Sequence, residues 1–207
     1  MRTSYPIRTL QSLEIVGGAL CLDLANTINS RRKPEYDYLT KYSDLTDWAV
    51  KVGILSVSQG NQLQKQAEQD AGESRDAFDK AILLREMFYR LFSRIAKRSE
   101  PDPGDMEAFI KFYAEATAHG VFVRKDHYFV MDWPVDETPD ALLWPIIYSA
   151  GQLLLSNELV HIKECPGCGW LFLDTSKNQS RRWCSMNACG ARDKMRRYHR
   201  RLRETGS

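Results

Sequence analysis

Four of the chain's five cysteines lie in its last fifth, arranged as two pairs. Two residues separate Cys165 from Cys168, fifteen residues lead to Cys184, and four more precede Cys189. A pair spaced by two residues can hold one side of a metal ion from a tight turn, and a second pair can complete a tetrahedron of sulfur ligands. The spacing therefore predicts one zinc ion held by four thiolates, in a closed site that is structural rather than hydrolytic.

Other interpretations of these four thiols stay open. An iron–sulfur cluster also takes four thiolates. A thioredoxin-type redox centre needs one pair beside a βαβ unit, which the sequence does not show. The thiols could also carry no ligand, but the two-pair spacing favours zinc. The fifth cysteine, Cys21, stands between Leu20 and Leu22 and is expected to be a small buried apolar side chain.

Basic residues gather in the same part of the chain. Residues 163–207 carry a net charge of +7, whereas residues 1–162 carry −5. Beyond the last cysteine the pattern indicates a helix with Met195, Tyr198 and Leu202 on its inward stripe. Guanidinium groups along the other face of such a helix could grip phosphate oxygens. The candidate nucleic-acid contacts are Lys177, Arg181, Arg182, Arg192, Lys194, Arg196, Arg197, Arg200, Arg201 and Arg203. The alternative is a solvated helix end, or one bound to the acidic body.

The elements that must position this module are mainly helical. Apolar spacings predict helices over 19–29, 43–53, 58–69, 75–97 and 106–118. Ser43 is the expected N-cap of the second helix, and Thr138 that of a further apolar helix in which Pro145 marks a kink or the start. Alternation around Lys125 and Asp126 predicts a hairpin. We therefore expect a mainly α fold: a helical bundle body with a small β-hairpin over 1–160. A treble-clef- or ribbon-like zinc module ending in a basic helix would follow at 161–207.

The sequence lacks the marks of several other classes of protein. Its N-terminus has no apolar run long enough for a signal peptide, and its longest apolar stretch, 141–155, is interrupted. We therefore expect a cytoplasmic protein without a membrane segment. The sequence contains no His-Glu-x-x-His, no Walker loop and no Gly-x-Ser-x-Gly, and its four histidines are scattered, so we do not expect an enzyme.

Two segments resemble known families. CPGCGWLFLDTSKNQSRRWCSMNACGAR, residues 165–192, resembles the CGNR zinc finger of bacterial proteins. GGALCLDLANTINSR, residues 17–31, is similar to the opening of the ABATE domain that accompanies this finger in stress-induced transcription regulators. The resemblance implies a regulator that binds zinc through the four cysteines and DNA through the basic positions. Ala191 replaces the asparagine for which the finger is named, so an amide that could touch a base or cap the helix is missing.

The polar residues of the N-terminal segment, Asp23, Asn26 and Arg31, have two interpretations. They could line a pocket for a small-molecule effector, or cap and position the first helix, which we favour. The partners expected are double-stranded DNA, a small effector and a second copy of the chain in a homodimer. The alternative is a module that binds RNA or protein, with Trp170 and Trp183 stacking on single-stranded bases if they are exposed.

Overall fold

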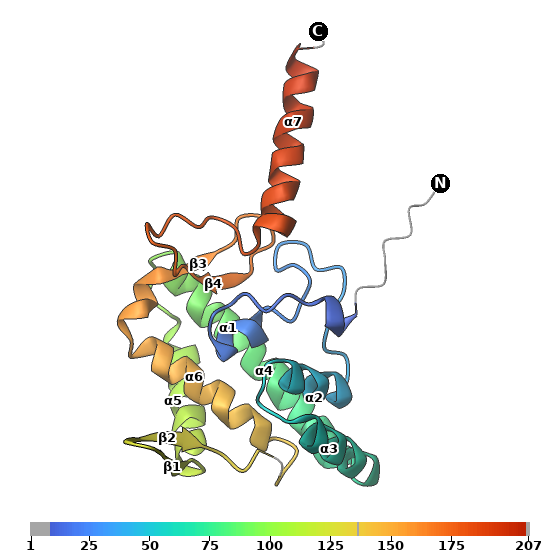
Figure 1. The fold of residues 1–207 in the computed structure, drawn as a ribbon, viewed down its shortest axis with the longest axis vertical. Coiled ribbons are helices and arrows are strands. Elements are labelled where there is room, and N and C mark those ends of the chain that lie inside the picture. Colours follow the sequence, from blue (N-terminus) through green and yellow to red (C-terminus); the bar gives the residue numbers. More distant parts are fainter. Residues whose placement is uncertain (1–8, 136, 206–207) are drawn as a thin grey trace.

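The computed structural model describes residues 9–135 and 137–205. Within these ranges the protein is mainly helical, with a helical body followed by a module that holds the four clustered cysteines (Figure 1). This confirms the expected fold class. The helices of the body are α1 (Leu20–Ala25), α2 (Tyr42–Lys51), α3 (Val57–Gln69), α4 (Ala71–Ala96), α5 (Pro103–Ala118) and α6 (Trp144–Leu154). Short 3-10 turns occupy Leu10–Ser12, Ala141–Leu143 and Asn157–His161.

Helix α4 is the centre of the bundle. Asp70 caps its first turn by accepting hydrogen bonds from the amides of Gly72 and Glu73. Leu84 and Phe88, four residues apart on its inward face, are completely buried. Helices α1, α2, α3 and α5 pack around α4, and α6 packs on α1 and α5. Helix α4 therefore contacts four of the other helices of the body.

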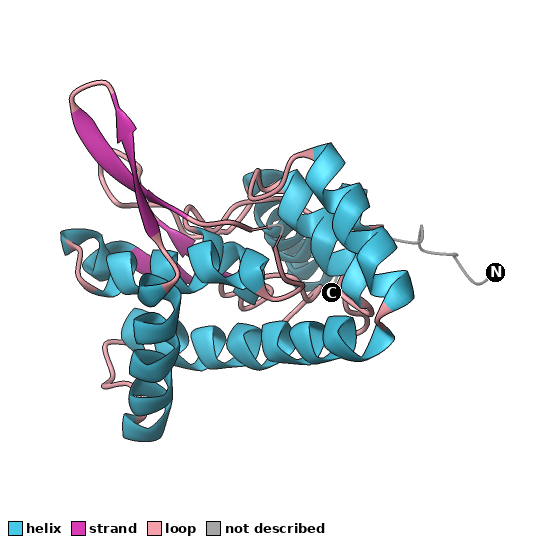
Figure 2. Cartoon of the chain, turned by 90° about the horizontal axis from the view of Figure 1, so that it is seen from below, coloured by secondary structure: helices cyan, strands magenta, loops and turns pink. Residues whose placement is uncertain are grey.

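The predicted hairpin is present. Strands β1 (Val121–Lys125) and β2 (Tyr128–Asp132) are antiparallel, and Lys125 pairs with Tyr128 beside the turn. Asp126 has a φ of 46°, the left-handed conformation that a tight turn requires. Figure 2 shows the hairpin extending beyond the helices, and in Figure 1 it lies at the end of the molecule opposite the cysteine module.

The first two helices differ from their expected bounds. Helix α1 ends at Ala25 rather than at residue 29, and the chain turns back immediately after it. Helix α2 has Lys41 as its N-cap, so the prediction that Ser43 caps it is wrong. Ser43 lies inside the first turn, where Asp44 accepts hydrogen bonds from the amide and hydroxyl of Thr40 at 2.8 and 2.6 Å.

Helix α6 begins later than expected. Pro145 lies in its first turn and so marks its start, as a residue without an amide proton can do at that position. Thr138 is not its N-cap; its hydroxyl instead donates to Asp140 at 2.9 Å. The 3-10 turn Ala141–Leu143 separates this pair from the helix.

The cysteine module, residues 161–205, begins with a two-stranded antiparallel sheet. Strand β3 (Ile162–Glu164) pairs with β4 (Leu171–Leu173), and β4 packs against α1 and α4. A π-helical turn, Met186–Gly190, leads into α7 (Ala191–Thr205). Helix α7 projects away from the body (Figure 1).

The projection of α7 overturns one prediction. Met195, Tyr198 and Leu202, expected to face inward, are 54, 55 and 50% exposed. The spacing of these residues does define one stripe of a helix, but the described part of the body does not cover it. None of the helices in the described ranges is both long enough and apolar enough to span a bilayer.

Candidate metal centre and basic helix

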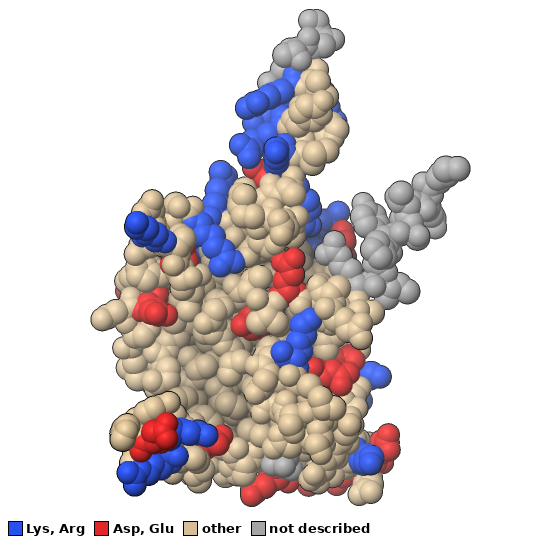
Figure 3. Space-filling view, viewed as in Figure 1, with Lys and Arg blue, Asp and Glu red and all other residues tan. Residues whose placement is uncertain are grey.

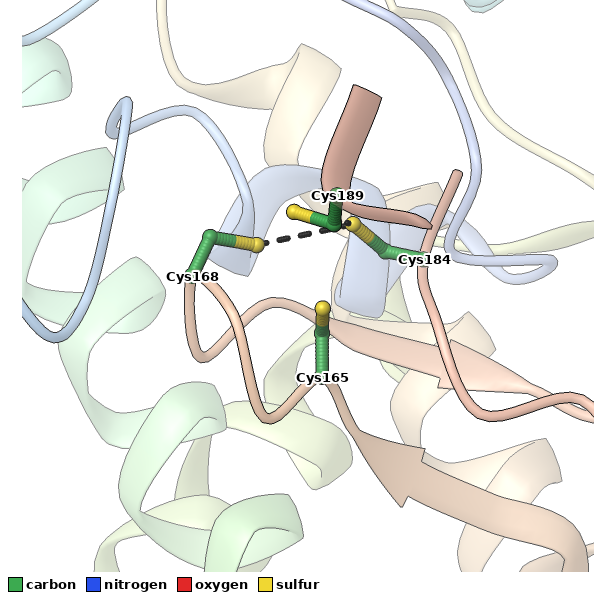
Figure 4. A group of neighbouring side chains, drawn as sticks. All are labelled: Cys165, Cys168, Cys184 and Cys189. Carbon is green, nitrogen blue, oxygen red and sulfur yellow. Dashed lines mark hydrogen bonds between the residues drawn. The ribbon is translucent and has the colours of Figure 1, made fainter. Parts of the chain in front are cut away.

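The side chains of Cys165, Cys168, Cys184 and Cys189 converge on one point (Figure 4). All four are buried, and their sulfur atoms lie within 4.8 Å of one another. The Sγ atoms of Cys168 and Cys184 are 3.5 Å apart, and those of Cys184 and Cys189 are 3.7 Å apart. Zinc bonded to four thiolates at about 2.3 Å places the sulfurs roughly 3.8 Å apart. The donor set and its spacing therefore fit one structural zinc ion.

The first cysteine pair is held by a tight turn at the end of the β3–β4 sheet. The amide of Gly169 donates to the carbonyl of Cys165, and the amide of Cys165 donates to the carbonyl of Trp170, both at 2.8 Å. Gly169 has a φ of 80°, and a Cβ added there would lie 2.8 Å from the Cβ of Arg31. Glycine is required at this position because both the backbone conformation and the space exclude a side chain.

The second pair is held by the start of the last helix. The Ser185 hydroxyl accepts from the amide of Ala188 at 3.3 Å and so caps the π-helical turn that carries Cys189. Helix α7 begins two residues after Cys189. With one pair on a β-hairpin and the other at the foot of a helix, the module is of the treble-clef type, and the metal centre anchors the base of α7.

Arg192 lies closer to the metal centre than the sequence suggested. Its guanidinium donates a hydrogen bond to the Sγ of Cys189 at 3.2 Å. A positive group beside a ligand sulfur offsets part of the excess negative charge of four thiolates around a divalent ion. Arg192 is also one of the predicted nucleic-acid contacts, and its side chain remains exposed.

The loop between the cysteine pairs is organised by Asp174, which sequence reasoning missed. One carboxylate oxygen accepts from the amide and hydroxyl of Ser176 at 3.0 and 2.6 Å. The other accepts from Lys163 at 2.5 Å and from the amide of Arg181 at 2.9 Å. Burial disfavours ionisation of this carboxyl, but the hydrogen bonds from Lys163 and Ser176 outweigh it and hold the pKa of Asp174 below its usual range. An aspartate two residues before a serine is a signal for such a turn.

The predicted basic residues of this loop have different environments. Lys177 and Arg182 are exposed. Arg181 is half-buried: its guanidinium lies 4.4 Å from the Phe172 ring centroid and donates to the carbonyls of Trp183 and Cys184. Arg181 therefore holds the segment that leads to the second cysteine pair.

Helix α7 presents its cations to solvent. All seven of its Lys and Arg residues are exposed: Arg192, Lys194, Arg196, Arg197, Arg200, Arg201 and Arg203. Asp193 pairs with Arg196 at 3.4 Å and with Arg197 at 3.1 Å. The helix carries seven Lys and Arg residues against two acidic residues, Asp193 and Glu204, so it has a clear excess of positive charge. Figure 3 shows this charge gathered on the projecting helix.

The two tryptophans named for base stacking are buried. Trp170 and Trp183 are each 7% exposed, and the indole of Trp170 donates to the carbonyl of Ile28 at 2.7 Å. The condition for their role in stacking, an exposed ring, is not met in this structure. They belong instead to the apolar core that the cysteine module shares with the body.

Asn26 covers the outer edge of strand β4. Its side-chain amide donates to the carbonyl of Leu171 at 2.8 Å, and its oxygen accepts from the amide of the same residue at 2.9 Å. The amide of Leu173 donates to the carbonyl of Gly17 at 2.8 Å. The segment around α1 thus pairs with a strand edge that would otherwise present unpaired backbone groups.

Arg31 fastens the same segment to the first cysteine pair. Its backbone amide donates to the carbonyl of Cys168 at 2.7 Å. Its side chain donates to the carbonyl of Ala25, pairs with Glu86 at 2.5 Å and lies 4.3 Å from the ring centroid of Tyr89. The guanidinium therefore links the end of α1 to α4.

Asp23 holds the chain that precedes α1. Its Oδ1 atom accepts from the amides of Gly17 and Val16 at 2.7 and 3.1 Å. Burial raises the pKa of Asp23 to about 6, although these two hydrogen bonds oppose the shift. Asp23, Asn26 and Arg31 all make contacts within the chain, which favours the positioning interpretation. A pocket for a small ligand at these residues stays a prediction.

The raised pKa of Asp23 predicts an unusual pH dependence. Between about pH 4 and pH 6 the folded state holds a proton on Asp23 that the unfolded state has released, so this group's contribution to stability falls as pH rises. A shift of about two units corresponds to roughly 2–3 kcal/mol. We expect Asp23→Asn, which keeps an oxygen acceptor, to gain stability relative to wild type by that amount from pH 4 to pH 6. Urea unfolding at several pH values measures it; a constant difference would contradict the prediction.

The fold and the site define a helical protein that carries a structural zinc module. Comparison with family models gives two matches. Residues 18–157 match the ABATE family, described as "Putative stress-induced transcription regulator", and residues 161–202 match the CGNR zinc finger. The chain belongs to the ABATE family, with a CGNR zinc finger after the ABATE domain, as the two sequence motifs indicated. Neither match is to an enzyme family. None of the curated proteins compared with the chain is similar enough to count as a match.

Proposed function

We propose that this protein is a transcription regulator that binds duplex DNA through α7 and the loop at 175–182. One observation carries the proposal: a helix with seven exposed cations projects from the molecule and is anchored at its base by the four-cysteine centre. At 1.5 Å per residue its fifteen residues span about 22 Å. The major groove of DNA, about 12 Å wide, admits one such helix.

Phosphate contacts would supply most of the affinity. The guanidinium of arginine can donate two hydrogen bonds to one phosphate group. The Lys and Arg side chains of α7 are spread over a wide face of the helix. Ala191, the first residue of α7, has no polar side chain to read a base. The exposed apolar stripe of Met195, Tyr198 and Leu202 could contact thymine methyl groups. We therefore propose strong dependence on salt and modest dependence on sequence.

The body would be the part through which regulation acts. An effector that altered the body would reach the zinc module through the contacts of Asn26 with Leu171 and of Arg31 with Cys168, because these fasten the two together. A homodimer would present two zinc modules and so read paired half-sites. Effector binding and dimerisation rest on the family resemblance and belong to the proposal.

Two arginines of α7 provide the direct test. We expect Arg196→Ala plus Arg200→Ala to weaken binding to all duplex sequences by about tenfold to a hundredfold. The slope of log affinity against log salt should become shallower by about two units, since about one counterion is released per phosphate contact. Fluorescence anisotropy over a salt series measures both. Arg75→Ala plus Lys65→Ala, which removes two exposed charges from the body, is the matched control. Wild-type protein that binds no duplex at low salt would contradict the proposal.

RNA or protein remains the alternative partner. Trp170 and Trp183, the two aromatic side chains predicted to stack on single-stranded bases, are buried. This observation favours the duplex. Competition between duplex DNA and single-stranded RNA of the same length separates the two: stronger displacement by RNA would favour the alternative.

A further inference from the structure

A groove lies where the body meets the zinc module. Its volume is about 550 Å³, and its walls come from four separate parts of the chain. The body contributes Arg32, from the loop after α1, and Lys97, at the end of α4. The zinc module contributes Lys163, Arg181 and Arg182. Five cationic side chains therefore line one groove, which we call the junction groove.

One buried carboxylate of the zinc module pairs with both cations that the body contributes to the junction groove. Among the lining residues that the structure describes, Glu164 alone is acidic. Its side chain is 9% exposed and pairs with Arg32 at 3.3 Å and with Lys97 at 2.9 Å. The hydroxyl of Ser93 donates to it at 2.6 Å. The side chains of Arg32 and Lys97 are 52 and 58% exposed, so one carboxylate at the floor orients two cations at the rim and cancels only one of their charges.

The opposite wall adds the positive charges of Lys163, Arg181 and Arg182. The guanidinium of Arg181 donates to neutral carbonyl groups of Trp183 and Cys184 and lies over an aromatic ring. Arg182 is exposed beside it. Lys163 differs, because Asp174 pairs with it at 2.5 Å. The groove therefore keeps an excess of positive charge on both walls, in a shape and donor set suited to a phosphate group.

We propose that the junction groove binds a backbone phosphate of the same DNA duplex that α7 engages, so that the ABATE body itself contributes to DNA affinity. This inference rests on the proposed function, since the phosphates belong to the same duplex. Figure 3 shows Lys and Arg both on α7 and on the part of the molecule directly below it. The ABATE domain is then a second contact surface for DNA. The junction between the ABATE domain and the zinc finger lies inside the interface with DNA.

The test removes the two cations that the body supplies. We expect full-length protein with Arg32→Ala plus Lys97→Ala to bind duplex DNA at least tenfold more weakly. Its salt slope should be shallower by about two units, as for two lost phosphate contacts. Lys65→Ala plus Lys111→Ala removes the same charge from exposed positions of α3 and α5 and should leave both quantities unchanged. Arg32→Lys plus Lys97→Arg keeps the charges and should keep most of the affinity.

Two further measurements keep the test decisive. Zinc content and the thermal midpoint of each variant show whether it is folded. If the double variant loses zinc, the single variants Arg32→Ala and Lys97→Ala replace it. Each is expected to make the slope of log affinity against log salt shallower by about one unit. Titration with inorganic pyrophosphate distinguishes a free phosphate ligand from the DNA backbone.

The outcomes separate this inference from the proposed function. If wild type binds duplex DNA and the double variant binds with the same affinity and slope, the junction groove is not part of the interface, and binding through α7 stands. If the double variant loses pyrophosphate binding but not DNA binding, a free phosphate ligand replaces the DNA backbone and the inference is overturned. If wild type binds no duplex at any salt concentration, the proposed function and this inference both fail.

Discussion

Removal of zinc is expected to unfold the module at 161–205 and to abolish binding of DNA. The module has two three-residue strands and a projecting helix, and its buried apolar side chains belong to a core shared with the body, so it has little core of its own. In zinc-finger peptides of similar size, structural zinc supplies about 10–16 kcal/mol of apparent folding free energy at pH 7. Because both cysteine pairs close on the ion, its loss should release the turn at Gly169 and the base of α7 together.

The loss should also reach the body. Strand β4 packs against α1 and α4, and its edge is paired with Asn26 and Gly17. We expect the thermal midpoint of the body to fall on chelation while most of its helical circular dichroism remains at low temperature. A zinc assay with circular dichroism, before and after chelation, measures both effects.

Single substitutions distinguish the metal from a general effect of cysteine loss. Cys168→Ser should abolish stoichiometric zinc, since the remaining three thiolates leave the tetrahedron open. Cys21→Ala is the matched control, because Cys21 is completely buried in the body and outside the cluster. Full retention of zinc by Cys168→Ser, or four thiols that react freely with an alkylating reagent in freshly purified native protein, would contradict the assignment.

Asn26→Ala is expected to destabilise the body strongly. Asn26 is 1% exposed and pairs with both the amide and the carbonyl of Leu171. Truncation leaves two backbone groups without partners in a buried place, at about 1–3 kcal/mol each. We expect a loss of about 2–5 kcal/mol in the free energy of unfolding. For a chain of this length each kcal/mol lowers the midpoint by about 2–4 °C.

The substitution also tests how the two parts are joined. If Asn26 fastens the zinc module to the body, the variant should bind zinc but release it to a chelator faster than wild type does. Asn61→Ala, at an exposed position of α3, is the control and should change stability by less than about 0.5 kcal/mol. A variant at position 26 with unchanged midpoint and unchanged rate of zinc release would contradict the role of this side chain.

Several features could be predicted because their cause is local. The zinc site follows from residue type and spacing, because two cysteines separated by two residues can bind one ion in any fold that lets the chain turn between them. The hairpin follows from alternation around a turn, and Asp126 supplies the left-handed residue. The prediction that Ser43 is an N-cap is wrong because another local interaction sets the start of the helix. Asp44 accepts hydrogen bonds from Thr40, and the helix begins one residue before Ser43.

Other features needed the tertiary structure. The apolar stripe of α7, Met195, Tyr198 and Leu202, has the spacing of a core face, but spacing alone does not determine whether another element covers it. The sequence predicts that Arg181 is a surface cation of the loop, yet its guanidinium donates to the carbonyls of Trp183 and Cys184. The junction groove could not be predicted from the sequence, because its cations belong to four segments, at residues 32, 97, 163 and 181–182, that are brought together only by folding.

By itself the sequence determined the chemistry of this protein: four thiolates for one zinc ion, an excess of positive charge at the same end, and a helical body. These properties depend on residue types and on short spacings along the chain, which are the same before and after folding. The tertiary structure decided what the polar residues near α1 do. Asn26 and its partner Leu171 are 145 residues apart in the chain, and a contact at that separation is set by packing of the whole fold.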